Sequence, residues 1–197
     1  MDVEYVSRRL DLRRFRLKAV WLLIIPFYVF ATPSTNLLWW GVGVSAAGLS
    51  LRAWAAGSIR KDRELATTGP YAHTRNPLYL GSFMLGAGVM VAGGQWLFGV
   101  AFVVLFLLVY RATVLREATE LEERFGASYR AYAAQVPTVL PRITPYRTEG
   151  SNSPLEGSDS PGGGFSQARY LRNREWEAAL GAVAAFGLLA LKLSLWA

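Results

Sequence analysis

The residue types best suited to chemistry gather between Arg63 and Gly81, in a polar stretch that separates two long apolar blocks. Gly69-Pro70 predicts a turn. Asn76-Pro77 predicts the start of a helix, with asparagine at the N-cap and proline at the first helical position. Aromatic and cationic side chains surround that start: Tyr71, Arg75 and Tyr79. Because a helix N-terminus presents unpaired N–H groups and a positive dipole end, the stretch predicts a site for an anionic or polar group at a membrane surface.

The apolar residues on either side of this stretch come in blocks rather than at amphipathic spacing. Of the 197 residues, 52% are hydrophobic, and the mean hydropathy is +0.23. A membrane-spanning helix needs about 20 mostly apolar residues. Five blocks qualify, although the first and third are short: Leu17–Ala31, Leu37–Ala56, Pro77–Ala92, Trp96–Leu115 and Ala178–Trp196. We therefore predict an all-α polytopic membrane bundle of about five transmembrane helices.

The net charge of +7 is distributed as in a membrane protein. Basic residues are dense in 8–18, before the first block, and in 60–75, between the second and third. The connections Thr32–Asn36 and Gly93–Gln95 carry no charge. This positive-inside pattern predicts a multi-pass inner-membrane protein with its N-terminus in the cytoplasm, and it argues against nucleic-acid binding. With no cysteine and one histidine, no metal site is predicted.

The remaining segments divide the chain into a membrane domain, a linker and a C-terminal unit. The fourth block continues into a charged helix that Gly126 ends, and a second short helix, Ala127–Gln135, follows. Twelve of the nineteen residues in 148–166 are Gly, Ser or Pro, which predicts a flexible linker between a domain at 1–147 and the rest. Residues 167–197 read as a basic interfacial segment and a last transmembrane helix. Near its far end, Lys192 is expected to snorkel outward.

Two ordered motifs carry a resemblance to a known family. The first is Leu65-x3-Gly69-Pro70-Tyr71-x3-Arg75-Asn76-Pro77-x-Tyr79-x-Gly81. After an apolar hairpin comes Glu117-x3-Leu121-x3-Phe125-Gly126-x2-Tyr129-x2-Tyr132-x3-Val136-Pro137. This core, at about 60–141, resembles the isoprenylcysteine carboxyl methyltransferase and phospholipid methyltransferase superfamily of integral membrane enzymes. The chain departs from that pattern at Asn76, where the family commonly has histidine, and at Ala118, where a second glutamate is frequent.

The resemblance implies a cytosolic helix–loop region that binds S-adenosylmethionine between the two motifs. The residues it implies for the cofactor are Arg63, Glu64, Leu65, Ala66, Tyr71, Asn76, Pro77, Leu78, Tyr79 and Glu117. It implies that Arg111 faces the polar head of the substrate, so that Arg111 and Glu117 are the candidate catalytic residues. Residue by residue, simpler roles stay open: an N-cap for Asn76, a solvated carboxylate for Glu117 and packing for the motif tyrosines.

The predicted reaction is in-line methyl transfer to a lipophilic acceptor that enters from the bilayer, either an isoprenoid-type carboxylate or a lipid head group. Proximity and orientation supply about 7–11 kcal/mol in such reactions. A carboxylate acceptor needs no base, which favours it over an amine. Two alternatives stay open: a sterol-type membrane reductase that uses NADPH, and a non-catalytic membrane scaffold. The sequence indicates neither the oligomeric state nor the identity of the acceptor.

Overall fold

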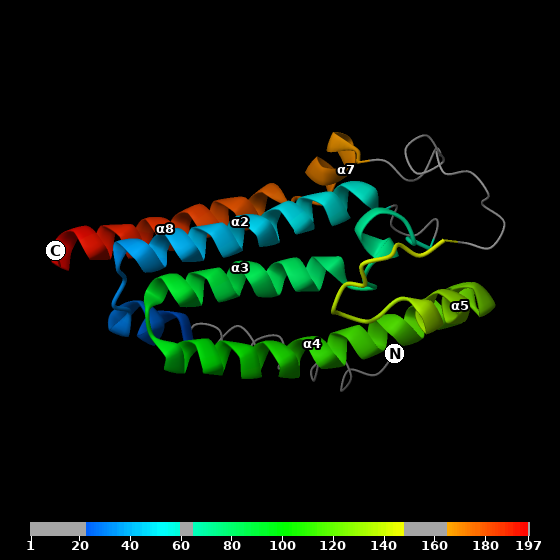
Figure 1. Ribbon diagram of the computed structural model, residues 1–197, viewed down its shortest axis with the longest axis horizontal. Helices are drawn as coiled ribbons and strands as arrows, with labels where there is room; N and C mark the ends of the chain where they lie inside the picture. Colours follow the sequence, from blue (N-terminus) through cyan, green and yellow to red (C-terminus); the bar gives the residue numbers. More distant parts are fainter. Residues whose placement is uncertain (1–22, 60–64, 148–164, 197) are drawn as a thin grey trace, which may run out of the picture.

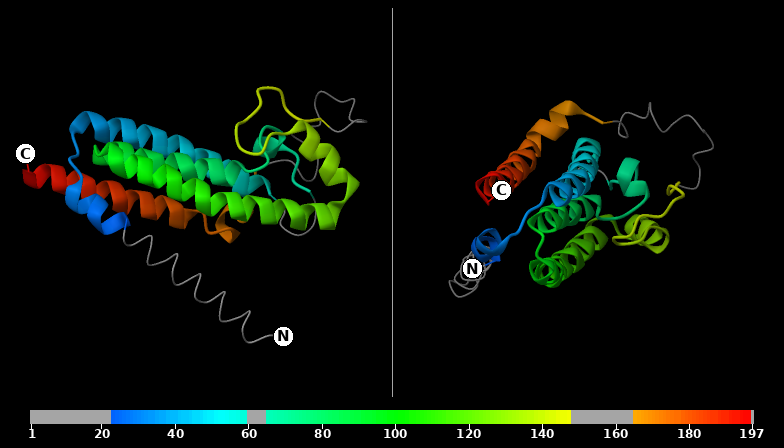
Figure 2. Two further views of the ribbon diagram at one scale, coloured as in Figure 1. Left: turned by 90° about the horizontal axis from the view of Figure 1, so that it is seen from below. Right: turned by 60° about the vertical axis from the view of Figure 1, so that its left-hand side comes forward.

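Four long helices lie side by side along the longest axis of the molecule (Figure 1). In chain order they are α2 (Thr35–Ser58), α3 (Pro77–Gly93), α4 (Trp96–Phe125) and α8 (Trp176–Trp196). The computed structural model describes residues 23–59, 65–147 and 165–196, and these parts contain no β-strand. Helix α3 packs between α2 and α4, and α8 lies against α2 and α3 (Figures 1 and 2). The prediction of an all-helical bundle is confirmed.

Shorter elements complete the chain. Residues 23–30 are helical, η1 (Gly69–Ala72) is a single 3-10 turn, and α5 (Ala127–Gln135) and α7 (Gln167–Arg172) are short α-helices. Gly126 separates α4 from α5 with a φ of 53°, a conformation that a residue with a Cβ adopts at a cost. The end of α4 and the extent of α5 agree with the sequence prediction.

Two of the described helices, α4 and α8, are long and apolar enough to cross a membrane, whereas α3 is apolar but has only 17 residues. No residue of α4 is buried within the described structure, although its apolar window has a mean hydropathy of 2.3. A core helix of a soluble protein would bury such a surface. The exposed apolar length of α4 is typical of a helix that faces lipid. The count of five transmembrane helices stays a prediction, and residues 17–22 of its first helix lie outside the described residues.

Helices α2 and α3 approach closely because glycines face each other across their interface. A Cβ added at Gly48 would stand 2.6 Å from the carbonyl oxygen of Gly81, and one added at Gly81 would stand 2.7 Å from that of Gly48. Close approach through small residues is a common mode of helix packing in lipid, where no hydrophobic force drives helices together. Gly48 and Gly81 therefore allow α2 and α3 to pack backbone against backbone.

The two uncharged connections meet at one end of the bundle, the left-hand end in Figure 1. The amide of Thr32 donates to the carbonyl of Gly93 over 2.9 Å, and the Gln95 amide donates to the Thr32 hydroxyl over 3.1 Å. Near this end, the ammonium of Lys192 donates to the carbonyls of Tyr28 and Val29 at 2.8 and 2.7 Å. The expectation that Lys192 snorkels outward stays a prediction, and the structure adds that its ammonium has partners within the protein. The last turn of helix 23–30 leaves carbonyls without intrahelical partners, and these attract the ammonium group.

Candidate functional site

At the opposite end of the bundle, a cavity of about 530 Å³ opens between the start of α3, the second half of α4 and α5. This volume is within the range of about 300–1,000 Å³ that is typical of small-molecule sites. Its wall combines apolar, aromatic and charged side chains. The lining residues are Ile59, Leu65, Ala66, Tyr71, Arg75, Asn76, Pro77, Leu78, Tyr79, Val114, Leu115, Glu117, Ala118, Glu120, Leu121, Arg124, Phe125, Tyr129, Tyr132 and Thr138.

The polar turn that leads into α3 is held by the extended segment after α5. The Thr74 hydroxyl, which is buried, donates to the carbonyl of Val139 over 2.9 Å. The Asn76 amide donates to the carbonyl of Thr138 over 2.9 Å. Asn76 stands at the N-cap position as predicted, but its side chain makes no capping hydrogen bond to α3. Its amide instead ties the helix start to residue 138.

Arg75 extends along the same wall of the cavity. Its guanidinium donates to the hydroxyls of Thr138 at 2.6 Å and Tyr129 at 3.3 Å. Its Nε is buried and has no hydrogen-bond partner among the described residues. A buried donor without a partner is costly, so this atom marks a place where a polar ligand group would be stabilised.

Tyr79 and Glu117 connect α3 to α4 across the cavity. The Tyr79 hydroxyl donates a hydrogen bond to Oε1 of Glu117. The ring of Tyr79 packs edge-on against Tyr110, with the centroids 4.8 Å apart, and Tyr110 stacks on Phe106. This aromatic contact orients the Tyr79 hydroxyl toward the Glu117 carboxylate, and both residues line the cavity.

Two further tyrosines form the floor between η1 and α5. The hydroxyl of Tyr132 donates to the carbonyl of Tyr71 over 2.7 Å, and both side chains are buried. Burial raises the pKa of the Tyr71 phenol above its ordinary value, with smaller contributions from Tyr132, Glu117 and Glu175. Burial likewise raises the pKa of Tyr132, although the nearby Arg75 opposes it. Both phenols are therefore neutral hydrogen-bonding groups at physiological pH.

The cavity brings together most of the residues that the sequence singled out. Those that line it are Leu65, Ala66, Tyr71, Asn76, Pro77, Leu78, Tyr79 and Glu117. Arg63 and Glu64 lie outside the described residues. Arg111 is exposed on α4 and is not part of the lining. Helix α4 is continuous there, and six residues rotate a regular helix by about 240°, so Arg111 and Glu117 point in different directions.

Several lining residues were not assigned to a site from the sequence. Thr138 comes directly after Val136-Pro137, the end of the second motif, and nothing local distinguishes it from a loop residue. Tyr129 and Tyr132 belong to the second motif, and their predicted packing role is confirmed because they form a small buried core with Val136. They also line the cavity, so the two roles coincide.

No group of three or more His, Cys, Asp or Glu side chains that could hold a metal ion occurs among the residues for which side-chain positions are described. The cavity wall itself carries the carboxylates Glu117 and Glu120 and no histidine. Its chemistry is that of hydrogen bonding, aromatic contact and charge complementarity.

Comparison with known proteins places this architecture in a family. The chain is 33% identical over 166 residues to the cobalt-zinc-cadmium resistance protein CzcN of Cupriavidus metallidurans, covering 73% of each chain. It is 29% identical to the nickel-cobalt-cadmium resistance protein NccN of Alcaligenes xylosoxydans xylosoxydans, over 66% of this chain and 67% of the relative. It is 31% identical to the protein-S-isoprenylcysteine O-methyltransferase of Schizosaccharomyces pombe, over 49% of this chain and 41% of that enzyme. No solved structure matches the chain. The family model for phospholipid methyltransferases matches residues 28–128, and the chain belongs to that family, within the superfamily that includes the isoprenylcysteine methyltransferases.

Proposed function

We propose that this protein is an integral membrane methyltransferase that transfers a methyl group from S-adenosylmethionine to a lipophilic acceptor at the cytoplasmic face of the inner membrane. One observation carries the proposal. Residues of both sequence motifs line the cavity, and the Tyr79–Glu117 hydrogen bond joins the two motifs.

The residues of the cavity suit the chemical groups of S-adenosylmethionine. The Glu117 carboxylate would attract a cationic or hydrogen-bond-donating part of the cofactor, and the rings of Tyr71 and Tyr79 would contact its aromatic base. The buried Nε of Arg75 would donate a hydrogen bond to a carboxylate or to another acceptor of the cofactor. The cofactor supplies an already activated methyl group, so the protein has only to hold the two reactants in line.

The part of the cavity wall that α4 forms supports a lipophilic acceptor. Leu115 lines the cavity and has 58% of its surface exposed, and Val114 lies beside it. Leu115 therefore belongs both to the cavity wall and to the exposed apolar surface of α4, where a lipophilic acceptor would approach. Among the described lining residues, the carboxylates of Glu117 and Glu120 are the candidates for a general base. An acceptor that is already ionised, such as an isoprenoid-type carboxylate, fits this wall better than an amine does.

Calorimetry on the detergent-solubilised protein tests the cofactor. We expect S-adenosylhomocysteine to bind and NADPH not to bind. The reverse result would indicate the reductase alternative, and the absence of binding by either ligand would indicate a scaffold.

Transfer of a labelled methyl group then tests the acceptor. A farnesylated cysteine with a free carboxylate and vesicles containing phosphatidylethanolamine provide the two acceptor classes. We expect transfer to the farnesylated carboxylate, and transfer only to phosphatidylethanolamine would contradict the preference for an ionised acceptor.

A further inference from the structure

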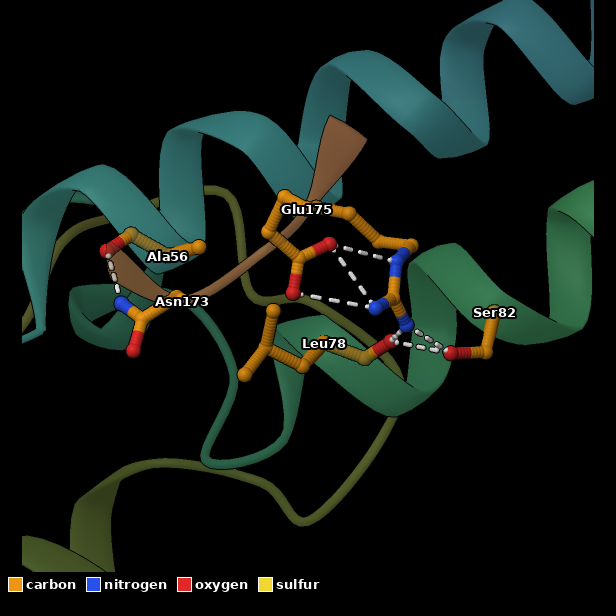
Figure 3. A network of polar contacts seen from close by, with 6 residues as sticks. Ala56, Leu78, Ser82, Asn173 and Glu175 are labelled. Carbon is orange, nitrogen blue, oxygen red and sulfur yellow. Dashed lines mark hydrogen bonds and ion pairs between the residues drawn. The ribbon is translucent and has the colours of Figure 1, made fainter. Parts of the chain in front are cut away.

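A segment near the C-terminus, beyond the residues matched by the family model, packs against the end of α2 that lies near the cavity. Residues 166–175, which we call the C-terminal anchor, comprise α7 and the corner before α8. The amide of Ser166 and the Arg169 Nε donate to the carbonyl of Gly57 over 3.0 and 2.7 Å. The Asn173 amide donates to the carbonyl of Ala56 over 2.9 Å (Figure 3). These are carbonyls of the last turn of α2, which lack partners within their own helix, so the anchor caps α2.

The anchor ends in a buried ion pair. Glu175 has only 9% of its surface exposed, and both of its carboxylate oxygens accept hydrogen bonds from the guanidinium of Arg52 on α2, at 3.0 Å each. The corner that presents Glu175 is conformationally costly, because Arg174 has a φ of 55°, a value disfavoured for a residue with a Cβ. A buried, bidentate pair fixes the orientation of both side chains.

The other side of the Arg52 guanidinium faces the first turn of α3. Its Nη1 donates to the carbonyl of Leu78 over 3.4 Å and also to the Ser82 hydroxyl (Figure 3). That hydroxyl in turn donates to the carbonyl of Leu78 over 2.8 Å. Leu78 and its neighbour Tyr79 line the cavity. The network therefore runs from the start of α8, through α2, to the turn that holds the Tyr79–Glu117 hydrogen bond.

We infer that Glu175 is a positioning residue for the methyl-donor cavity: by orienting Arg52, it holds the first turn of α3 in the position that the cofactor needs. This inference rests on the proposed function, and it assigns a role to the C-terminal helix that the family core alone does not provide. Helix α8 is thus held at two ends, by Glu175 beside the cavity and by Lys192 at the far end. Only the first of these contacts leads to the cavity.

This difference between the two ends supplies a matched control. Glu175→Gln removes the charge at the cavity end, and Lys192→Met removes the charged contact at the far end. The double variant Arg52→Met/Glu175→Met removes both charges of the pair. Replacing a buried ion pair with apolar residues avoids an unpaired charge and is often neutral for stability, whereas removing one partner is not.

The affinity for S-adenosylhomocysteine, measured well below each melting temperature, distinguishes positioning from stability. We expect Glu175→Gln and the double variant to raise the Kd about tenfold, the effect of losing roughly one hydrogen bond. The double variant should have a higher melting temperature than Glu175→Gln but the same weakened affinity for S-adenosylhomocysteine. Lys192→Met should lower the melting temperature and leave the Kd unchanged. The inference is overturned if the double variant binds as the wild type does, or if Lys192→Met weakens binding as much as Glu175→Gln.

Hydrogen exchange gives a readout that does not depend on the cofactor. The amides of residues 80–83, in the first turns of α3, should exchange faster in Glu175→Gln and in the double variant but not in Lys192→Met. If the wild type does not bind S-adenosylhomocysteine, the proposed function fails, and this exchange pattern still decides whether Glu175 positions α3. Unchanged exchange in all three variants would overturn the inference.

Discussion

The hydroxyl of Tyr79, in the first turn of α3, donates a hydrogen bond to Oε1 of Glu117, in the second half of α4. The two residues are 38 positions apart and belong to different sequence motifs. Their contact closes one side of the cavity and orients the carboxylate.

Glu117→Gln tests the charge of this carboxylate. The carbonyl oxygen of glutamine can still accept the hydrogen bond from Tyr79, so thermal stability should change little. The loss of a charge-assisted hydrogen bond to the cofactor costs about 1.5–3 kcal/mol, or roughly ten- to a hundredfold in affinity. Calorimetry with S-adenosylhomocysteine would measure it. Glu123→Gln is the control, because Glu123 is exposed on the same helix outside the cavity. Equal affinities of the two variants would remove Glu117 from the site.

Tyr79→Phe tests the partner of that carboxylate. The phenylalanine ring keeps the packing against Tyr110, but Glu117 loses the donor that orients it. We expect a stability loss of about 0.5–1.5 kcal/mol and a measurable loss of affinity for S-adenosylhomocysteine. Full affinity in Tyr79→Phe would show that Glu117 needs no orientation by α3.

Gly48→Ala tests the contact between α2 and α3. The added Cβ would stand 2.6 Å from the Gly81 carbonyl oxygen, so the helices must separate, at a cost of about 1–3 kcal/mol. Gly43→Ala is the matched control on the same helix, since a Cβ there meets nothing within 4 Å. Thermal unfolding in detergent should show a lower melting temperature for Gly48→Ala only. Equal melting temperatures would mean that the interface relaxes without cost.

The raised pKa of Tyr71 predicts a loss of folding stability at alkaline pH. Burial raises its pKa above the ordinary value of 10.0, so the unfolded chain releases this proton at a lower pH than the folded chain does. The stabilisation is complete below pH 10 and is lost as the pH rises above it. Thermal unfolding measured at successive alkaline pH values should show this fall, and Tyr71→Phe should make it shallower. The same slope in Tyr71→Phe would assign the titration to other groups.

Single cysteines in this cysteine-free chain test the proposed membrane topology. Ser34 is the N-cap of α2 and Ser194 lies in the last turn of α8, and the start of α2 and the C-terminus lie at the same end of the bundle (Figure 1). Thr67 comes just before η1, near the cavity. A membrane-impermeant thiol reagent applied from outside should label a cysteine at either of the first two positions and not one at the third. Labelling of Thr67→Cys would invert the topology, and opposite results at Ser34→Cys and Ser194→Cys would contradict the count of five transmembrane helices.

The sequence by itself determined the helical class, the main helix ends and the motifs that the cavity gathers. The end of α4 at Gly126 and the start of α3 at Pro77 depend on the local conformational preferences of those residues, and such preferences are visible in a short stretch of sequence. Runs of apolar residues likewise predict helices without knowledge of their neighbours.

Only the tertiary structure decided which side chains meet. Asn76 donates to residue 138, 62 positions away, instead of capping its own helix, and Arg52 pairs with Glu175 across 123 positions. The Lys192 ammonium donates to the carbonyls of Tyr28 and Val29, 164 and 163 positions away. Each of these contacts depends on the order and rotation of packed helices, which local sequence does not specify. Arg111 and Glu117 are close in sequence, yet the rotation of one continuous helix separates their side chains.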